Sequence, residues 1–156
     1  LITVDIANPS NPKLVGRVLV ADAREVYVSG NYAFVTLGLN GLVIVDISDP
    51  RYPRVAGRLN TDGRAQDVYV AGNYAYVADD ENGLVIIDVS QPSYPKLVSS
   101  VYTDGPAGRV YVFDDYAYVA IADSWNGLAV VDISDPLHPD VVNGVLWMSF
   151  YDVSGR

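Results

Sequence analysis

The chain has 156 residues, of which 50% are hydrophobic, and it carries a formal net charge of −9 at pH 7 with no cysteine. This acidic balance argues against nucleic acid or an anionic membrane surface as a partner, because both require a positively charged footprint. The absence of cysteine excludes disulfides, thiolate metal sites and thiol nucleophiles. No apolar run approaches the ~20 residues of a membrane helix, so no membrane insertion is expected in this segment.

Four similar apolar stretches, each ending in an aspartate, divide the chain. They are Ile2–Asp5, Leu42–Asp46, Leu84–Asp88 and Leu128–Asp132, and their aspartates are separated by 41, 42 and 44 residues. A paired-proline turn and another short apolar run follow each aspartate. A fixed period of this length indicates one supersecondary unit repeated along the chain.

The chain is predicted to open halfway through a unit. Residues 1–6 predict a third strand and residues 14–20 a fourth, so that 1–23 form a half unit. Each later unit has four runs of about four to seven residues rich in Val, Ile and Tyr, separated by Gly, Pro, Asn and Asp, which is typical of strands and turns. Complete units are predicted at 24–60, 66–102 and 108–147, and the start of another at 149–156, with a first strand at 149–153.

The strand patterns favour stacked sheets over a two-layer sandwich. In Leu42–Val45 and Tyr74–Val77 both faces of the strand are apolar, as expected for strands that are covered on both sides. Small four-stranded sheets obtain such cover when they stack radially. The sequence therefore predicts an all-β chain, a β-propeller of four-stranded antiparallel blades, with about three and three-quarter repeats of 41–44 residues.

The stretch Leu42-Val43-Ile44-Val45-Asp46 resembles the signature of the LVIVD-repeat family of bacterial and archaeal β-propellers. The resemblance recurs four times and covers essentially the whole chain. It implies an extracellular or cell-surface location, since many members belong to such proteins, and it implies no set of catalytic residues. The acidic, cysteine-free composition fits an exported protein.

Fifteen predicted strands do not close a ring of the usual four to eight blades. Three explanations are open: a fragment of a larger propeller, which is favoured, association with copies of itself, or closure alone as a distorted four-blade ring. The chain also begins at Leu1, in mid-strand, so we expect it to be a piece of a longer precursor. Open ends would leave apolar blade faces and strand edges uncovered, which favours self-association or polymerisation edge to edge.

The loops fall on two faces. The proline face carries the Gly-Asn hairpins and the paired-proline turns, and it is nearly the same in every repeat. The loop face carries the links before the Val-Tyr-Val and Leu-Val-Ile-Val strands, and it differs between repeats, so we expect binding there. Its candidate residues are Arg24, Glu25, Arg64, Asp67, Asp79, Asp80, Glu81, Arg109 and Trp125.

Glu25, Asp67 and Arg109 occupy the same repeat position, at the mouth of the innermost strand. Two carboxylates and a guanidinium there could bind a polar ligand or serve as acid, base and clamp. An ion-paired lining of the central channel is the favoured interpretation. If the site is catalytic, Glu25 and Asp67 are the pair to test for a carbohydrate-active hydrolase or lyase.

Other candidate residues have two interpretations each. The run Asp79-Asp80-Glu81 could hold Ca²⁺, although it lacks the alternating spacing of a calcium loop, and a solvated loop is favoured. Trp125 could contact a sugar or a protein, or pack over the neighbouring blade. The repeated aspartates could ring a metal, but a role in accepting backbone N–H groups at the proline turn is favoured.

No catalytic motif is present: the chain lacks a nucleophile elbow, a zinc-binding His-Glu-x-x-His and a phosphate-binding loop. The sequence therefore favours a non-catalytic scaffold that binds a protein or glycan, without a cofactor. A carbohydrate-active enzyme is the alternative.

Overall fold

The computed structural model describes residues 1–122 and 127–146, and the side chains of residues 143–146 lie outside the description. Fourteen β-strands and no helix occur in these residues, in agreement with the predicted all-β fold. The predicted strand at 149–153 and the candidate Trp125 lie outside the described residues. In the part described, no helix has the length and apolar character needed to cross a bilayer.

The strands form one two-stranded and three four-stranded sheets, in which every pair is antiparallel. We call them the half blade (β1–β2), blade 1 (β3–β6), blade 2 (β7–β10) and blade 3 (β11–β14). The strands are β1 (Ile2–Asp5), β2 (Lys13–Arg17), β3 (Val26–Ser29), β4 (Tyr32–Thr36), β5 (Leu42–Asp46), β6 (Arg54–Leu59), β7 (Asp67–Ala71), β8 (Tyr74–Ala78), β9 (Leu84–Asp88), β10 (Lys96–Val101), β11 (Ala107–Phe113), β12 (Tyr116–Ile121), β13 (Gly127–Asp132) and β14 (Asp140–Leu146).

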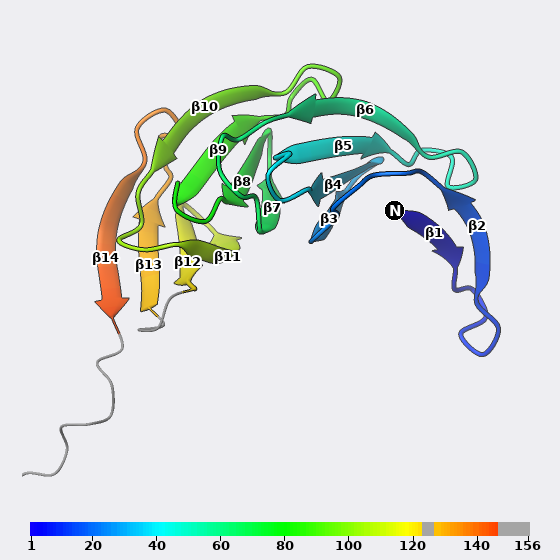
Figure 1. Ribbon diagram of the computed structural model, residues 1–156, viewed down its shortest axis with the longest axis horizontal. Coiled ribbons are helices and arrows are strands. Elements are labelled where there is room, and N and C mark those ends of the chain that lie inside the picture. Colours follow the sequence, from blue (N-terminus) through cyan, green and yellow to red (C-terminus); the bar gives the residue numbers. More distant parts are fainter. Residues whose placement is uncertain (123–126, 147–156) are drawn as a thin grey trace, which may run out of the picture.

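Each complete blade is a meander in which neighbouring strands in the chain are neighbours in the sheet. Figure 1 shows the blades along an arc, with the first strands β3, β7 and β11 on its concave side and the fourth strands on its convex side. This is the predicted propeller arrangement. Over the described residues the arc stays open between the half blade and β14, so these residues do not form a distorted four-blade ring.

Neighbouring blades bury each other's apolar faces. Leu42, Val43, Ile44 and Val45 of β5 are all 0% exposed, because one face of the strand packs toward the half blade and the other toward blade 2. Burial on both faces explains why the strand sequence shows no alternation of apolar and polar residues.

The repeated aspartates cap the turns that follow the third strands. In each repeat one carboxylate oxygen accepts a hydrogen bond from the backbone N–H two residues later, at 2.8–2.9 Å. The residues are Asp5, Asp46, Asp88 and Asp132. The structural interpretation of these aspartates is therefore confirmed, and Arg54 adds an ion pair to Asp46 at 2.9 Å. These contacts, with Ser48 first and Arg54 after it, lower the pKa of Asp46 to about 2.

Candidate functional site at the channel mouth

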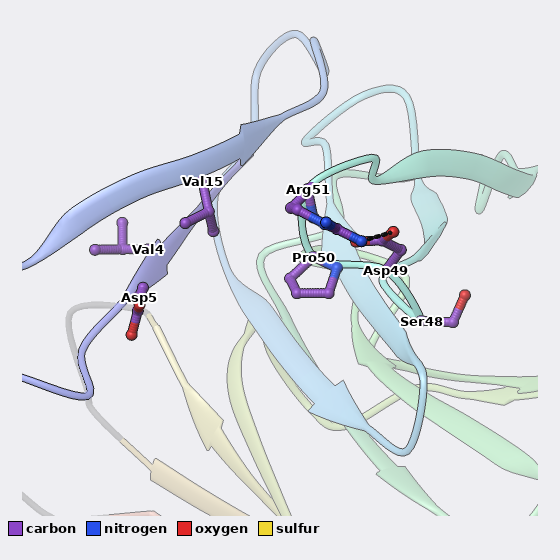
Figure 2. Close-up of a pocket in the computed structure, with 7 residues that line it drawn as sticks. All are labelled: Val4, Asp5, Val15, Ser48, Asp49, Pro50 and Arg51. Atoms are coloured by element: carbon purple, nitrogen blue, oxygen red, sulfur yellow. Dashed lines mark hydrogen bonds and ion pairs between the residues drawn. The ribbon is translucent and has the colours of Figure 1, made fainter.

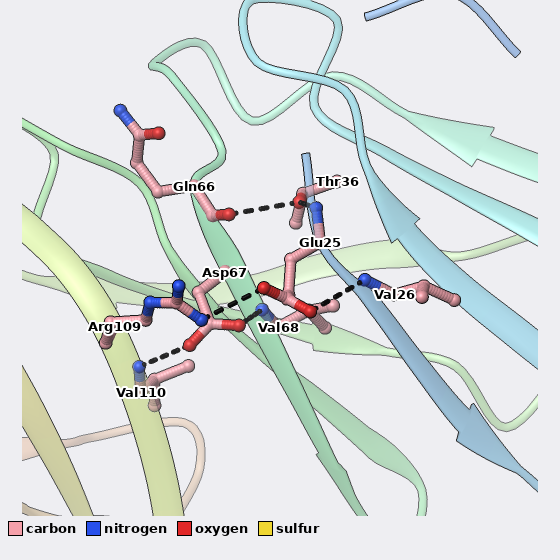
Figure 3. Close-up of polar contacts among 8 residues, drawn as sticks. All are labelled: Glu25, Val26, Thr36, Gln66, Asp67, Val68, Arg109 and Val110. Atoms are coloured by element: carbon pink, nitrogen blue, oxygen red, sulfur yellow. Dashed lines mark hydrogen bonds and ion pairs between the residues drawn. The ribbon is translucent and has the colours of Figure 1, made fainter. Parts of the chain in front are cut away.

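Glu25, Asp67 and Arg109 come together where the first strands of the three blades begin (Figure 3), and these strands line the concave side of the arc in Figure 1. Glu25 directly precedes β3, Asp67 begins β7, and Arg109 lies in β11 beside a break in register. We call these three residues the channel mouth. The repeat places them at equivalent positions because each link enters the first strand of its blade from the loop face.

Arg109 reaches past blade 2 to blade 1. Its Nη1 donates to Oε2 of Glu25 at 2.9 Å, although the two residues are 84 positions apart in the chain. The Arg109 side chain is 72% exposed and that of Glu25 is 35% exposed, so water can reach this ion pair. The pair matches the ion-paired lining that the sequence favoured, and it leaves most of the Arg109 side chain exposed.

Asp67 is buried at only 8% exposure, and both of its oxygens are engaged. Oδ1 accepts from the Val68 amide at 2.8 Å, and Oδ2 accepts from the Val110 amide of the next blade at 2.9 Å. Burial raises the pKa of the carboxyl, and the two backbone hydrogen bonds oppose that shift. Asp67 thus joins blade 2 to blade 3 through a hydrogen bond, and backbone donors engage both of its oxygens.

Thr36 supports the same region and was not singled out from the sequence. Its hydroxyl accepts from the Glu25 amide at 3.1 Å and donates to the Gln66 carbonyl at 3.2 Å, which links blade 1 to the link before β7. The residue is fully buried. The sequence did contain a signal for Thr36, because the other repeats have alanine, Ala78 and Ala120, at this strand position.

A separate network of hydrogen-bonded side chains crosses the loop face from blade 1 to blade 2. Arg24 donates to the Gln66 side chain at 3.5 Å, and Gln66 donates to Oδ2 of Asp80 at 3.2 Å. Asp22 lies 3.7 Å from the Arg24 guanidinium. Of the predicted residues, Arg24 and Asp80 are therefore joined through Gln66, while Arg64 and Glu81 are exposed.

The structure corrects the favoured interpretation of Asp79 as part of a solvated loop. Asp79 is 0% exposed, and it accepts hydrogen bonds from the Thr61 hydroxyl at 2.6 Å and from Nδ2 of Asn82 at 3.0 Å. Burial raises its pKa. The Asp79 carboxylate thus holds the link that follows blade 1. In the described part of the chain, no three His, Cys, Asp or Glu side chains lie close enough together to form a metal-binding group.

Three tyrosines line the first strands below the channel mouth. The rings of Tyr27 and Tyr69 have centroids 4.8 Å apart, and those of Tyr69 and Tyr111 are 5.1 Å apart. This row continues from blade to blade because each Val-Tyr-Val strand places its tyrosine at the same point. The repeated tyrosine was the sequence signal for the row.

Two grooves lie where the half blade meets blade 1. The first, of about 620 Å³, lies between Val4, Asp5 and Val15 of the half blade and the turn 48–51 of blade 1 (Figure 2). Arg51 in that turn is paired with Asp49 at 3.0 Å. The second groove, of about 580 Å³, is lined on the loop-face side by Leu19, Ala21, Leu37, Asn40 and residues 58–60. Sequence reasoning pointed to neither groove, since both depend on how two sheets meet.

The LVIVD repeat family matches the chain in four consecutive segments, residues 1–20, 21–61, 62–103 and 104–146. The chain belongs to the LVIVD repeat family. Each of the last three segments contains one four-stranded blade, and the first contains the half blade. The family match confirms the resemblance carried by Leu42–Asp46. No curated protein matches the chain.

Proposed function

We propose that this LVIVD-repeat chain is a non-catalytic scaffold of an exported or cell-surface protein that binds a protein or glycan through its loop face. The observation that carries the proposal is the contrast between the two faces. At the channel mouth the same repeat position holds Glu25, Asp67 and Arg109, whereas the aspartates of the proline turns make the same contact in every repeat.

The charges on the loop face suit a polar ligand. Arg24, Arg64 and Arg109 are exposed there, and so is the acidic residue Glu81. Guanidinium groups bind carboxylates and the polar groups of ligands in a fixed geometry. The net charge of −9 makes nucleic acid an unfavourable partner. A patch with both signs of charge favours a protein surface or an acidic glycan.

The carbohydrate-active alternative has one observation in its favour, the raised pKa of Asp67, which is a property of general acids. Against it, both oxygens of Asp67 accept backbone hydrogen bonds, and Glu25 is held by Arg109. A general acid must present its proton to the substrate. The arrangement therefore favours binding over hydrolysis or elimination. Turnover of polysaccharides that is lost in Asp67→Asn would reverse this preference.

The proposal is tested by probing the purified chain on arrays of neutral and acidic oligosaccharides and of peptides. We expect a ligand whose binding is lost when Arg24, Arg64 and Arg109 are all changed to alanine. The matched control changes Tyr52 and Tyr94, two exposed residues of the proline face, and should bind normally. Binding that is lost only in the control, or no binding on any array, would contradict the proposal.

A further inference from the structure

A network of three residues closes the loop face of blade 2. Asp79 accepts hydrogen bonds from the Thr61 hydroxyl at 2.6 Å and from Nδ2 of Asn82 at 3.0 Å. The same Nδ2 donates to the Thr61 carbonyl at 3.3 Å. Because Asp79 is 0% exposed inside this network, the link before blade 2 is sealed against the loop that ends at Gly83.

Blade 1 has Ala21, Leu37 and Asn40 at the three equivalent positions. Leu37 takes the place of Asp79, because the amide of each donates to the carbonyl of the glycine in the Asn-Gly turn, at 2.8 and 2.9 Å. Ala21 takes the place of Thr61, because each directly precedes an aspartate with positive φ. The side chains of alanine and leucine carry no polar atom, so the sealing network of blade 2 cannot form in blade 1.

The loop-face groove of about 580 Å³ lies at this place. Its lining includes Ala21, Leu37 and Asn40, together with Leu19 and residues 58–60. The volume falls in the range of about 300–1,000 Å³ that is typical of small-ligand sites. Blade 1 is therefore open at the position where polar contacts close blade 2.

The exposure of this groove belongs to the repeat position and not to the end of the arc. Leu19 holds the position of Asn60 and Tyr102, each directly after the residue that pairs with the leucine of the third strand. Tyr102 is 58% exposed although blade 2 has a neighbour on either side. Leu19, at 89% exposure, is thus exposed where the other repeats are exposed as well.

The lining combines apolar side chains with a positive charge. Leu19, Ala21 and Leu37 supply the apolar part, and no carboxylate lines the groove. Arg58 is exposed, and within the described residues it takes no part in the ion pairs that other arginines form. Asn40 is exposed too, and its amide can donate and accept hydrogen bonds.

The aspartates beside the lining residues have other partners. Asp22 lies 3.7 Å from the Arg24 guanidinium, and Oδ1 of Asp62 accepts from Nδ2 of Asn60 at 3.3 Å. The Arg58 guanidinium thus remains the charged group that a ligand in the groove meets. A guanidinium pairs with a carboxylate through two parallel hydrogen bonds, so a carboxylate is the complementary group.

We propose that this groove binds the carboxyl-terminal residue of a protein partner when that residue has an apolar side chain. The terminal carboxylate pairs with Arg58, the apolar side chain contacts Leu19 and Leu37, and the Asn40 amide bonds to the peptide backbone. Capture of a terminal carboxylate is a recurring mode of peptide recognition. An acidic sugar has the carboxylate but no apolar group to cover the two leucines.

The groove is a second site on the loop face. Its lining shares no residue with Arg24, Arg64 and Arg109, which carry the proposed function. The inference therefore goes beyond the proposed function and does not rest on it.

The probe is N-acetyl-glycyl-leucine with a free carboxylate, titrated into the isotopically labelled chain while its amide signals are recorded by NMR. We expect saturable shifts at residues 37–40 and 58–60. The leucinamide form lacks the charge and N-acetyl-glycyl-glycine lacks the apolar side chain, so each should bind at least about tenfold more weakly.

Variants assign the binding to the groove. Arg58→Gln should bind the free acid no better than the amide form. Arg17→Gln makes the same charge change at the equivalent position of the half blade, outside the groove, and should bind normally. The double variant Ala21→Thr, Leu37→Asp copies the sealing network of blade 2 and should lose binding. Because Arg58 is exposed, its variant decides the matter if the double variant fails to fold.

Four results would overturn the proposal. They are the absence of saturable shifts up to about 10 mM probe, shifts confined to residues outside the groove, equal binding of the acid and the amide, and tighter binding of methyl glucuronide than of the peptide at the same residues. None of them bears on a ligand held by Arg24, Arg64 and Arg109, so the two proposals fail separately.

Discussion

Oδ2 of Asp67 accepts a hydrogen bond from the backbone amide of Val110 at 2.9 Å, and this contact joins the first strands of blades 2 and 3. Glu25, one repeat earlier, makes a different contact, an ion pair with Arg109. At the same repeat position, Asp67 thus joins two blades through a buried hydrogen bond, whereas Glu25 forms an ion pair that is exposed to solvent.

Replacement of Asp67 by alanine should destabilise the fold. The change leaves the Val68 and Val110 amides without their acceptor, and a buried unsatisfied donor costs about 1–3 kcal/mol in free energy of unfolding. The matched control is Glu25→Gln at the equivalent position, where an exposed ion pair contributes at most about 1 kcal/mol. Urea denaturation of both variants checks the difference, and a larger loss in Glu25→Gln would refute the assigned roles.

The buried carboxyl of Asp79 should give a pH dependence of stability. Burial raises its pKa in the folded state above the ordinary value of 3.8, so the stability that it contributes is complete below pH 3.8 and is lost as pH rises through the folded pKa. The Asp79→Asn variant removes this titration and serves as the reference. The stability of the wild type relative to this variant should therefore fall with rising pH, and denaturation series from acidic to neutral pH measure it. A relative stability that increases with pH would show that the carboxylate is stabilised by its surroundings.

Replacing a core leucine by alanine should cost less stability at the end of the arc than in its middle. Leu84 of blade 2 is 0% exposed between two blades, while the equivalent Leu128 of blade 3 is partly exposed. Leu84→Ala should cost about 2–5 kcal/mol in free energy of unfolding, and Leu128→Ala clearly less, because its site is open to water. Equal losses in urea denaturation would mean that blade 3 is covered in solution.

Two glycines with positive φ should respond differently to alanine. Gly83 has φ +72° and packs against the backbone of residues 101–103, whereas Gly72 has φ +55° and no heavy atom within 4 Å of the place that an alanine Cβ would take. Backbone strain alone costs about 1 kcal/mol or more, and the steric contact at Gly83 adds to it. Thermal unfolding should therefore show a larger loss for Gly83→Ala, and the reverse order would contradict the packing of the Asn-Gly turn.

The repeat period and the strand patterns were sufficient to predict the blades, because both are properties of neighbouring residues. The turn aspartates such as Asp46 were predictable for the same reason, since their partners lie two residues away. The buried state of Asp79 was not, because it depends on Thr61, which lies 18 residues earlier in the chain.

The channel mouth shows the same limit. Its three residues were located by their common place in the repeat, but sequence spacing could not tell that Asp67 turns toward Val110 while Arg109 crosses to Glu25. These choices depend on the angle between neighbouring blades and on side-chain length. The exposure of Val28 was also beyond a sequence argument in detail, because it depends on which strands lie beside it.

The central claim is that each blade protects its neighbour's apolar face, and a pair of single-cysteine variants in the otherwise unchanged chain tests it most directly. Val28→Cys and Val70→Cys place the same thiol at equivalent positions, 58% exposed in blade 1 and 7% exposed in blade 2. Their rates of reaction with a thiol reagent under native conditions are the measurement. We predict rapid reaction at position 28 and slow reaction, limited by local opening, at position 70. Similar rates at the two positions would contradict the stacking of blades along the arc.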